Sequence, residues 1–363
     1  MRIYSLFLPQ FHSTPANDEF WGDRFTDWVT TRLAKPLFTG HKQPSRHVYG
    51  EYDLDSRNEI LRQAKLAASY GINAFGVYHY WFDESSRALE GPINKMMTMK
   101  WLPVNYFVCW VNLDWTKSWV GEPGTIIRKQ QYTDAFFDKF TDDLVAHFLS
   151  QNYEKIDGRP LLYVHRPSDF DFRKFKLLLL SKARNAGFEN LLLMSPLDHL
   201  SEQDVSEFDY TLGYPPGDYL PWIIRFFSFL RKLLAFPILR YWYNRLLFKY
   251  VRVVDFRAYV RGYARFVKRK LKNPKFIPVL LNQWDNTPRY GYNGFVFVND
   301  TPKEQFYLYD NVFALCKSRD FVMIKAWNEW AEGNTLEPCN EYGLKKLEAL
   351  RTAVEKNIIG SGK

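Results

Sequence analysis

The chain alternates eight short apolar segments with longer segments of helical spacing, such as 56–70, 135–149, 172–186, 301–318 and 342–357. This pattern predicts parallel strands joined by crossover helices, because parallel neighbours need a long connection. Eight units favour an α/β fold of the (β/α)8 TIM barrel type, with residues 1–363 as a single catalytic domain. The expected strands are Arg2–Leu8, Ile72–Val77, Val104–Cys109, Leu161–Val164, Leu191–Met194, Phe208–Leu212, Phe276–Leu281 and Phe321–Ala326.

Most of the expected strands end in polar or aromatic residues. The carboxyl ends of barrel strands meet at one face, so we expect these side chains to converge there. Aromatic rings stack on the apolar faces of sugars, and histidine or asparagine can bind hydroxyl groups. The alternatives are core tryptophans, structural histidines and ordinary loop asparagines. The candidate substrate-binding residues are Gln10, His12, Tyr78, His79, Tyr80, Trp81, Trp110, Asn112, Trp115, His165, Tyr214, Asn282, Trp284, Trp327 and Asn328.

Two glutamates, Glu329 and Glu332, follow the eighth expected strand among the tryptophans Trp327 and Trp330. A carboxyl group in an apolar wall has a raised pKa, which suits general acid or base catalysis on a sugar. We therefore predict that Glu329 and Glu332 are the catalytic pair. The alternative is a strand end with solvated glutamates, which the neighbouring tryptophans disfavour.

Several other kinds of site lack their sequence signature. No glycine-rich phosphate loop is present, which disfavours nucleotide sites and also the open parallel sheet, the main alternative fold. There is no G-x-S-x-G motif, and Cys109 is expected in the barrel core. His12, His79 and His165 each follow a strand, but their spacing matches no metal-ligand pattern. We therefore expect neither a metal nor a cofactor.

Residues 215–254 interrupt the alternation between the sixth and seventh expected strands. Within this insert, residues 222–254 contain seven basic residues, many aromatic residues and no acidic residue. We expect a helical insert that lies on an anionic membrane surface, as basic amphipathic segments do. A lid packed on the barrel explains the pattern equally well. Nucleic acid is not an expected partner, because no recognised binding motif accompanies the basic residues.

The chain has three widely spaced cysteines, Cys109, Cys316 and Cys339, which indicate a reducing compartment. Its first residues lack the regions of a signal peptide, and no apolar run is long enough to span a bilayer. We expect a cytoplasmic protein, peripheral at the inner face of the plasma membrane if the insert binds lipid.

The chain carries seven specific motifs: Leu8–His12, Trp21–Gly22, Phe25–Trp28, Lys35–Phe38, Tyr78–Phe82, Ile156–Pro160 and Trp327–Glu332. Together they resemble the WbsX family, and the likeness covers nearly the whole chain. This family is often labelled glycosyltransferase and is found with bacterial surface-polysaccharide genes. That family is similar in turn to glycoside hydrolase family 99, the endo-α-mannosidases, which are (β/α)8 barrels. Asp27 stands where a glutamate is more usual.

The resemblance implies a retaining mechanism without an enzyme nucleophile. By analogy with family 99, Glu329 would assist the substrate's own 2-hydroxyl to form a 1,2-anhydro sugar. Glu332 would protonate the leaving oxygen and later activate water. The implied substrate is a bacterial surface polysaccharide or oligosaccharide, or its lipid-linked precursor. The alternatives are a glycosyltransferase or transglycosylase of O-antigen or capsule biosynthesis, and a non-catalytic glycan-binding barrel.

Overall fold

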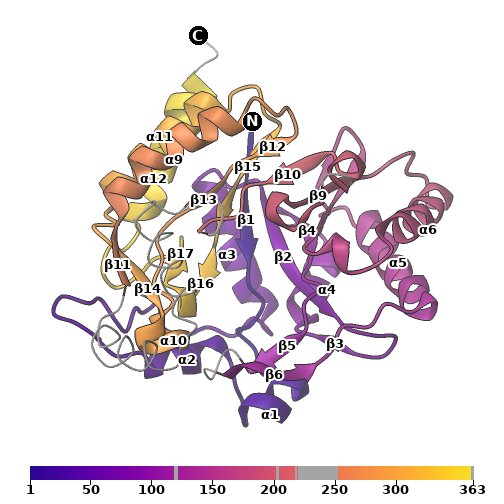
Figure 1. The fold of residues 1–363 in the computed structure, drawn as a ribbon, viewed down its shortest axis with the longest axis horizontal. Coiled ribbons are helices and arrows are strands. Elements are labelled where there is room, and N and C mark those ends of the chain that lie inside the picture. Colours follow the sequence, from indigo (N-terminus) through magenta and orange to yellow (C-terminus); the bar gives the residue numbers. More distant parts are fainter. Residues whose placement is uncertain (118–121, 202–203, 217–218, 220–251, 361–363) are drawn as a thin grey trace, which may run out of the picture.

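In the computed structural model, the protein contains a parallel sheet that curves until its two end strands meet (Figure 1). The end strands, β12 and β13, are consecutive in the chain and are separated only by Pro278, which has no N–H to offer to the ladder. The sheet is therefore nearly closed, which confirms the predicted TIM-barrel fold. In sheet order its strands are β12 (Phe276–Ile277), β10 (Tyr210–Leu212), β9 (Leu192–Pro196), β8 (Arg159–Val164), β4 (Asn105–Trp110), β2 (Ala74–Trp81), β1 (Arg2–Phe7), β15 (Phe321–Lys325) and β13 (Val279–Leu281).

The structure describes residues 1–117, 122–201, 204–216, 219 and 252–360. The expected insert 215–254 lies mostly outside them, so its helical form and its two alternatives, membrane anchor and lid, remain predictions. Among the described helices, none is long and apolar enough to cross a membrane. Within the same residues, no cluster of three or more His, Cys, Asp or Glu side chains could hold a metal ion.

Helices surround the barrel, and five of them match the expected segments. Among the described residues there is a sixth long helix, α9, which is not one of those we expected. Local signals set their ends: the Ser56 hydroxyl caps the N-terminus of α3, and Gly71 follows its C-terminus with a positive φ of 92°. The helices are α1 (Pro15–Trp21), α2 (Asp27–Leu33), α3 (Arg57–Ser69), α4 (Gly91–Thr98), α5 (Asp134–Leu149), α6 (Phe172–Asn185), α9 (Phe256–Lys270), α10 (Thr287–Tyr290), α11 (Pro302–Leu315) and α12 (Lys345–Val354).

Further short strands pair with one another or with a barrel strand, and most of them lie where the barrel strands end. All of them except β7, which pairs with the first residues of β8, belong to connections that follow a barrel strand, so they shape the loops of the mouth. They are β3 (Arg87–Ala88), β5 (Trp115–Lys117), β6 (Glu122–Arg128), β7 (Lys155–Ile156), β11 (Arg252–Asp255), β14 (Phe295–Val298), β16 (Asn328–Glu329) and β17 (Asn334–Thr335).

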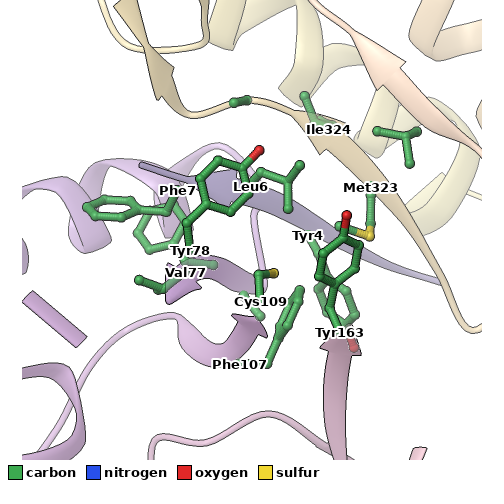
Figure 2. Close-up of a cluster of buried hydrophobic side chains, with 14 of the residues drawn as sticks. Tyr4, Leu6, Phe7, Val77, Tyr78, Phe107, Cys109, Tyr163, Met323 and Ile324 are labelled. Carbon is green, nitrogen blue, oxygen red and sulfur yellow. The ribbon is translucent and has the colours of Figure 1, made fainter. Parts of the chain in front are cut away.

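Side chains alternate along each barrel strand between the interior and the surrounding helices. Phe107 and Cys109 of β4 face the interior, where Gly76 of β2 makes room for them. A Cβ atom at Gly76 would lie 2.7 Å from Phe107 Cζ and 2.8 Å from Cys109 Sγ. Figure 2 shows these two side chains in an interior cluster with Tyr163 and Met323. The barrel is therefore packed through its middle, and a site is expected at its mouth.

Candidate active site

The turn that carries the two glutamates is tied to the end of β1 by an asparagine. Asn328 Oδ1 accepts a hydrogen bond from the Leu8 N–H at 2.7 Å, and Asn328 Nδ2 donates to the Leu8 carbonyl at 2.9 Å. A 3-10 turn, Trp330–Glu332, follows β16 at once. These two hydrogen bonds from one side chain to the Leu8 backbone fix the point at which Glu329 leaves the barrel.

A buried carboxyl group, Glu337, supports the same turn through hydrogen bonds. Its Oε2 accepts hydrogen bonds from Trp330 Nε1 and from the Tyr52 hydroxyl, both at 2.7 Å. Burial raises the pKa of Glu337 to about 8, so the group is largely protonated at neutral pH. Trp330 is fully buried, so it packs beneath the glutamates and is not a surface for a ligand.

Glu329 is buried at the mouth, where only 5% of its surface is exposed. The Tyr78 hydroxyl donates a hydrogen bond to its Oε1 at 2.7 Å. Its Oε2 has no hydrogen-bond partner among the described residues. Burial raises the pKa of Glu329 to about 7, and the neighbouring Glu332 carboxylate adds to this rise, while Lys325 opposes it. Glu329 therefore holds a proton much of the time near neutral pH.

Glu332 is in the opposite electrostatic situation. Arg289 Nη1 donates to its Oε1 at 2.8 Å, and Lys325 Nζ lies 3.8 Å from its Oε2. Burial favours the neutral acid, but the two cations, Lys325 and Arg289, together hold the pKa of Glu332 below its usual value. The surroundings therefore favour the proton on Glu329 and the negative charge on Glu332.

Arg289 connects Glu332 to a third buried acid, Asp27 of α2. Its Nη2 donates to Asp27 Oδ1 at 3.3 Å, and Asp27 Oδ2 accepts the Ala331 N–H at 3.2 Å. Burial raises the pKa of Asp27, which Arg289 opposes. The shorter aspartate at this position therefore still reaches the turn that carries both glutamates.

Aromatic rings lie near the glutamates. Lys325 Nζ lies 4.5 Å from the Tyr214 ring centroid and 4.9 Å from that of Trp284. The His165 ring lies 5.6 Å from Tyr214. Tyr80 is close enough for the charge on Glu329 to raise its pKa further, beyond the effect of burial. Of the predicted substrate-binding residues, the structure therefore groups five with the glutamates: Tyr78, Tyr80, His165, Tyr214 and Trp284.

Four other predicted residues point away from the mouth, into the layer between barrel and helices. Trp110 lies 4.5 Å from the ring of Phe140 on α5, and Trp81 lies 5.4 Å from the same ring. His79 Nε2 lies 3.6 Å from an Asp143 carboxylate oxygen, also on α5. Trp327 is fully buried and donates from Nε1 to Gln63 of α3. The reason is the alternation along a strand: Tyr78 and Tyr80 face inward, so His79 and Trp81 face outward.

Three predicted asparagine residues use their amides to hold backbone in place. Asn112 exchanges two hydrogen bonds with the backbone of Arg166, at 2.8 and 2.7 Å. Asn282 Nδ2 donates to the Ala326 carbonyl at 3.0 Å, and its Oδ1 accepts from the Tyr309 hydroxyl at 2.6 Å. Asn328 binds Leu8 as described above. These side chains therefore position the strand ends and have little left to offer a sugar hydroxyl.

The remaining predicted residues support the loops. Gln10 Nε2 donates to Asn17 of α1 at 2.9 Å, and His12 Nδ1 donates to the Pro9 carbonyl at 2.8 Å. Trp115 packs edge-on against Tyr80 at a centroid distance of 5.4 Å. Gln10 and His12 shape the loop after β1, and Trp115 supports a ring of the site.

Sequence reasoning missed Lys325 and Arg289 as members of the site. Lys325 carried a signal, because a lysine inside a buried strand reading FVMIK needs a partner. Arg289 carried none, since it meets Asp27 from 262 positions away in the sequence.

The model of the family described as Glycosyltransferase WbsX matches residues 3–350. The chain belongs to this family. The family predicted from the seven motifs is thereby confirmed, and its description is that of glycosyltransferases.

This member of the WbsX family is also similar to curated proteins and to solved structures. The uncharacterized protein WxcX of two Xanthomonas campestris pv. campestris strains is 28% identical over 370 residues, covering 98% of this chain and 50% of WxcX. The chain thus spans half the length of these relatives. A GH99 endo-α-mannosidase from Bacteroides thetaiotaomicron has a TM-score of 0.58 at 11% identity, with 100% and 99% of the two chains covered. A glycoside hydrolase-like protein has a TM-score of 0.55 at 13% identity, with 97% and 93% covered. At these identities the structural likeness shows the fold.

Proposed function

We propose that Glu329 and Glu332 act as the acid/base pair of an enzyme that cleaves or transfers a glycosidic bond. The supporting observation is a buried Glu329 beside a half-buried Glu332, whose surroundings shift their pKa values in opposite directions, with Glu329 Oε2 left without a hydrogen-bond partner among the described residues. Two carboxyl groups whose environments push their pKa values apart are the usual arrangement of an acid with a base.

In the proposed reaction, one carboxylate takes the proton of the sugar's 2-hydroxyl. The 2-oxygen attacks the anomeric carbon, the bond to the leaving oxygen breaks, and the other carboxyl group gives its proton to that oxygen. Water then opens the 1,2-anhydro ring: it gives one proton to the carboxylate that acted as the acid, and the carboxyl group that acted as the base returns its proton to the 2-oxygen. In a transferase, an acceptor hydroxyl takes the place of water.

The mechanism requires the base to be ionised and the acid to be protonated when the reaction starts. The family resemblance makes Glu329 the base and Glu332 the acid, yet in the free protein burial favours the proton on Glu329. Substrate binding must therefore move the proton between them, or the roles are exchanged. Lys325 Nζ lies 3.9 Å from a Glu329 oxygen and 3.8 Å from a Glu332 oxygen, so it stabilises the negative charge on either one.

The proposed substrate is an oligosaccharide or polysaccharide of the bacterial surface, or its lipid-linked precursor, bound by Tyr80, His165, Tyr214 and Trp284. The structural relatives named as endo-α-mannosidases suggest an α-linked mannoside as the first substrate to test. We propose further that residues 1–363 work as one catalytic domain. Peripheral membrane contact through residues 222–254 would bring a lipid-linked glycan to the mouth.

Incubation in H₂¹⁸O with α-mannosides, surface oligosaccharides and nucleotide-sugars, followed by mass spectrometry, tests this function. A hydrolase yields reducing ends that contain ¹⁸O, and a transglycosylase yields longer products without it. A glycosyltransferase forms products only when a nucleotide-sugar is present. Products that form equally with a Glu329→Gln/Glu332→Gln double variant would refute the proposed site. Binding without any product would favour the glycan-binding alternative.

The variant Tyr78→Phe is expected to shift one limb of the pH–rate profile toward higher pH. The Tyr78 hydroxyl stabilises the ionised form of Glu329, so losing it raises the pKa of that group. If Glu329 is the base, the acidic limb moves, because activity is lost as pH falls through its pKa. If Glu329 is the acid, the alkaline limb moves. A profile with both limbs unchanged would contradict any role for Glu329.

A further inference from the structure

The charge of the chain is unevenly distributed. Residues 219–284 contain 15 of the 49 basic residues but only one of the 40 acidic residues, Asp255. The other residues therefore carry 34 basic and 39 acidic side chains, so they are net acidic although the whole chain is at +9. A field this asymmetric predicts an anionic partner for one side of the molecule.

Helix α9 presents this charge on its outer face. One face packs into the fold through Tyr259, Tyr263 and Phe266, which are all buried. The helix lies on the outside of the barrel beside α11 (Figure 1). Its exposed side, which we call the α9 ridge, consists of Arg257, Arg261, Arg265, Lys268, Arg269 and Lys272 just past its end.

Most of the α9 ridge lacks compensating charge. Arg257 pairs with Asp255, but within the described residues no ion pair involves Arg261, Arg265, Lys268 or Arg269. Residues 257, 261, 265 and 269 are each four positions apart, so neighbours on one helix face repel one another. No described contact offsets this repulsion, and an anionic surface outside the molecule would.

The described residues on either side of segment 220–251 are connected with α9. Tyr219, just before it, packs on Tyr259, Tyr263 and Phe266, and Gly262 leaves room for its ring. Arg252, just after it, opens the strand that leads directly into α9. The sequence 220–251 is itself basic, rich in Trp, Tyr and Phe, and free of acids. Aromatic residues of this kind favour the interface of a lipid bilayer, whereas recognition of a charged polymer needs no such apolar content.

We propose that the α9 ridge binds the surface of an anionic phospholipid bilayer. The attraction is electrostatic, and each basic residue near such a surface strengthens binding about fivefold. A helix on the barrel wall that lies along a bilayer would place the barrel axis roughly parallel to it. This contact does not depend on the proposed reaction, because it is measured without turnover.

Co-sedimentation of the full chain with vesicles tests the proposal. We expect binding to vesicles of 70% phosphatidylcholine and 30% phosphatidylglycerol, little binding to pure phosphatidylcholine, and loss of binding in 0.5 M NaCl. The ridge variant combines Arg261→Gln, Arg265→Gln, Lys268→Gln and Arg269→Gln, and should bind the anionic vesicles at least tenfold more weakly. The matched control removes four exposed charges elsewhere, at Lys65, Lys100, Lys139 and Lys345, and should bind almost as the parent does.

Each contrary result overturns the proposal. Equal binding to both vesicle types would mean that charge is not the cause. A ridge variant that binds like the parent would place the contact elsewhere, such as in segment 220–251 alone. Retention on heparin without binding to any vesicle would assign the ridge to an acidic polymer. Circular dichroism checks that the variant is folded. The variant Arg261→Lys/Arg265→Lys/Arg269→Lys, which keeps the charge, should retain binding.

Discussion

Glu329→Gln and Glu332→Gln are each expected to lower kcat by about 10²–10⁴-fold, the usual contribution of a positioned acid or base. Glutamine has the shape of the carboxyl group but neither accepts nor delivers the proton that the reaction needs. At position 329 it imitates the protonated acid already favoured there, so the fold should be retained. Activity and thermal unfolding are measured on the same preparations, with Glu355→Gln on the exposed end of the last helix as the control.

Leaving-group chemistry then separates the two roles. The variant that lacks the general acid should recover most of its activity on an aryl glycoside whose phenol leaves without protonation. The variant that lacks the base should remain slow on every substrate. Recovery in Glu332→Gln supports the roles implied by the family resemblance, and recovery in Glu329→Gln supports the exchanged roles. Near-parent activity of either variant on its natural substrate would remove that residue from the mechanism.

Arg289→Met is expected to reduce the free energy of unfolding by about 3–5 kcal/mol at pH 7, because it leaves buried charge without its partner. Arg289 serves two acids, Asp27 and Glu332, and its own side chain is 9% exposed. Chemical denaturation measures the loss. The matched control is Arg32→Met, which breaks an exposed pair with Glu51 and should cost no more than about 1 kcal/mol.

The loss should depend on pH in a defined direction. Without Arg289, the folded pKa of the buried Asp27 rises further above its unfolded value. A buried acid with a raised pKa stabilises the fold at low pH, and this stabilisation is lost as pH rises through the folded pKa. The loss of stability in Arg289→Met should therefore grow toward neutral pH. The double variant Asp27→Asn/Arg289→Met removes the unpaired charge and should recover part of the loss. A deficit that is independent of pH and of Asp27 would show that Arg289 acts only through packing.

The barrel could be predicted because its signal is local and repeated. Each strand is a short apolar run whose length and neighbours identify it without reference to the rest of the chain. The split at Pro278 and the helix α9 were missed. The split depends on which neighbouring strand each half-strand pairs with. In α9, the dense basic residues mask the helical spacing of the apolar residues.

The motif around the glutamates was also readable in the sequence, and it located Glu329 and Glu332 at the end of the last strand. Sequence position alone did not tell which neighbours of a strand end face the mouth. Tyr78 and His79 are adjacent in the chain, yet one hydrogen-bonds Glu329 and the other packs against α5. A shift of one residue reverses the side of the strand, so this choice needs the register of the folded sheet.

The sequence by itself determined the class of fold, the family and the two carboxyl groups, because these depend on periodicity and on residues close together in the chain. Only the tertiary structure decided their protonation. The charge on Glu332 and the proton on Glu329 depend on Lys325, on Arg289 and on burial by several loops. Electrostatic energy falls off with distance in space, not with separation along the chain, so residues far apart in the sequence set these pKa values once folding brings them within 4 Å.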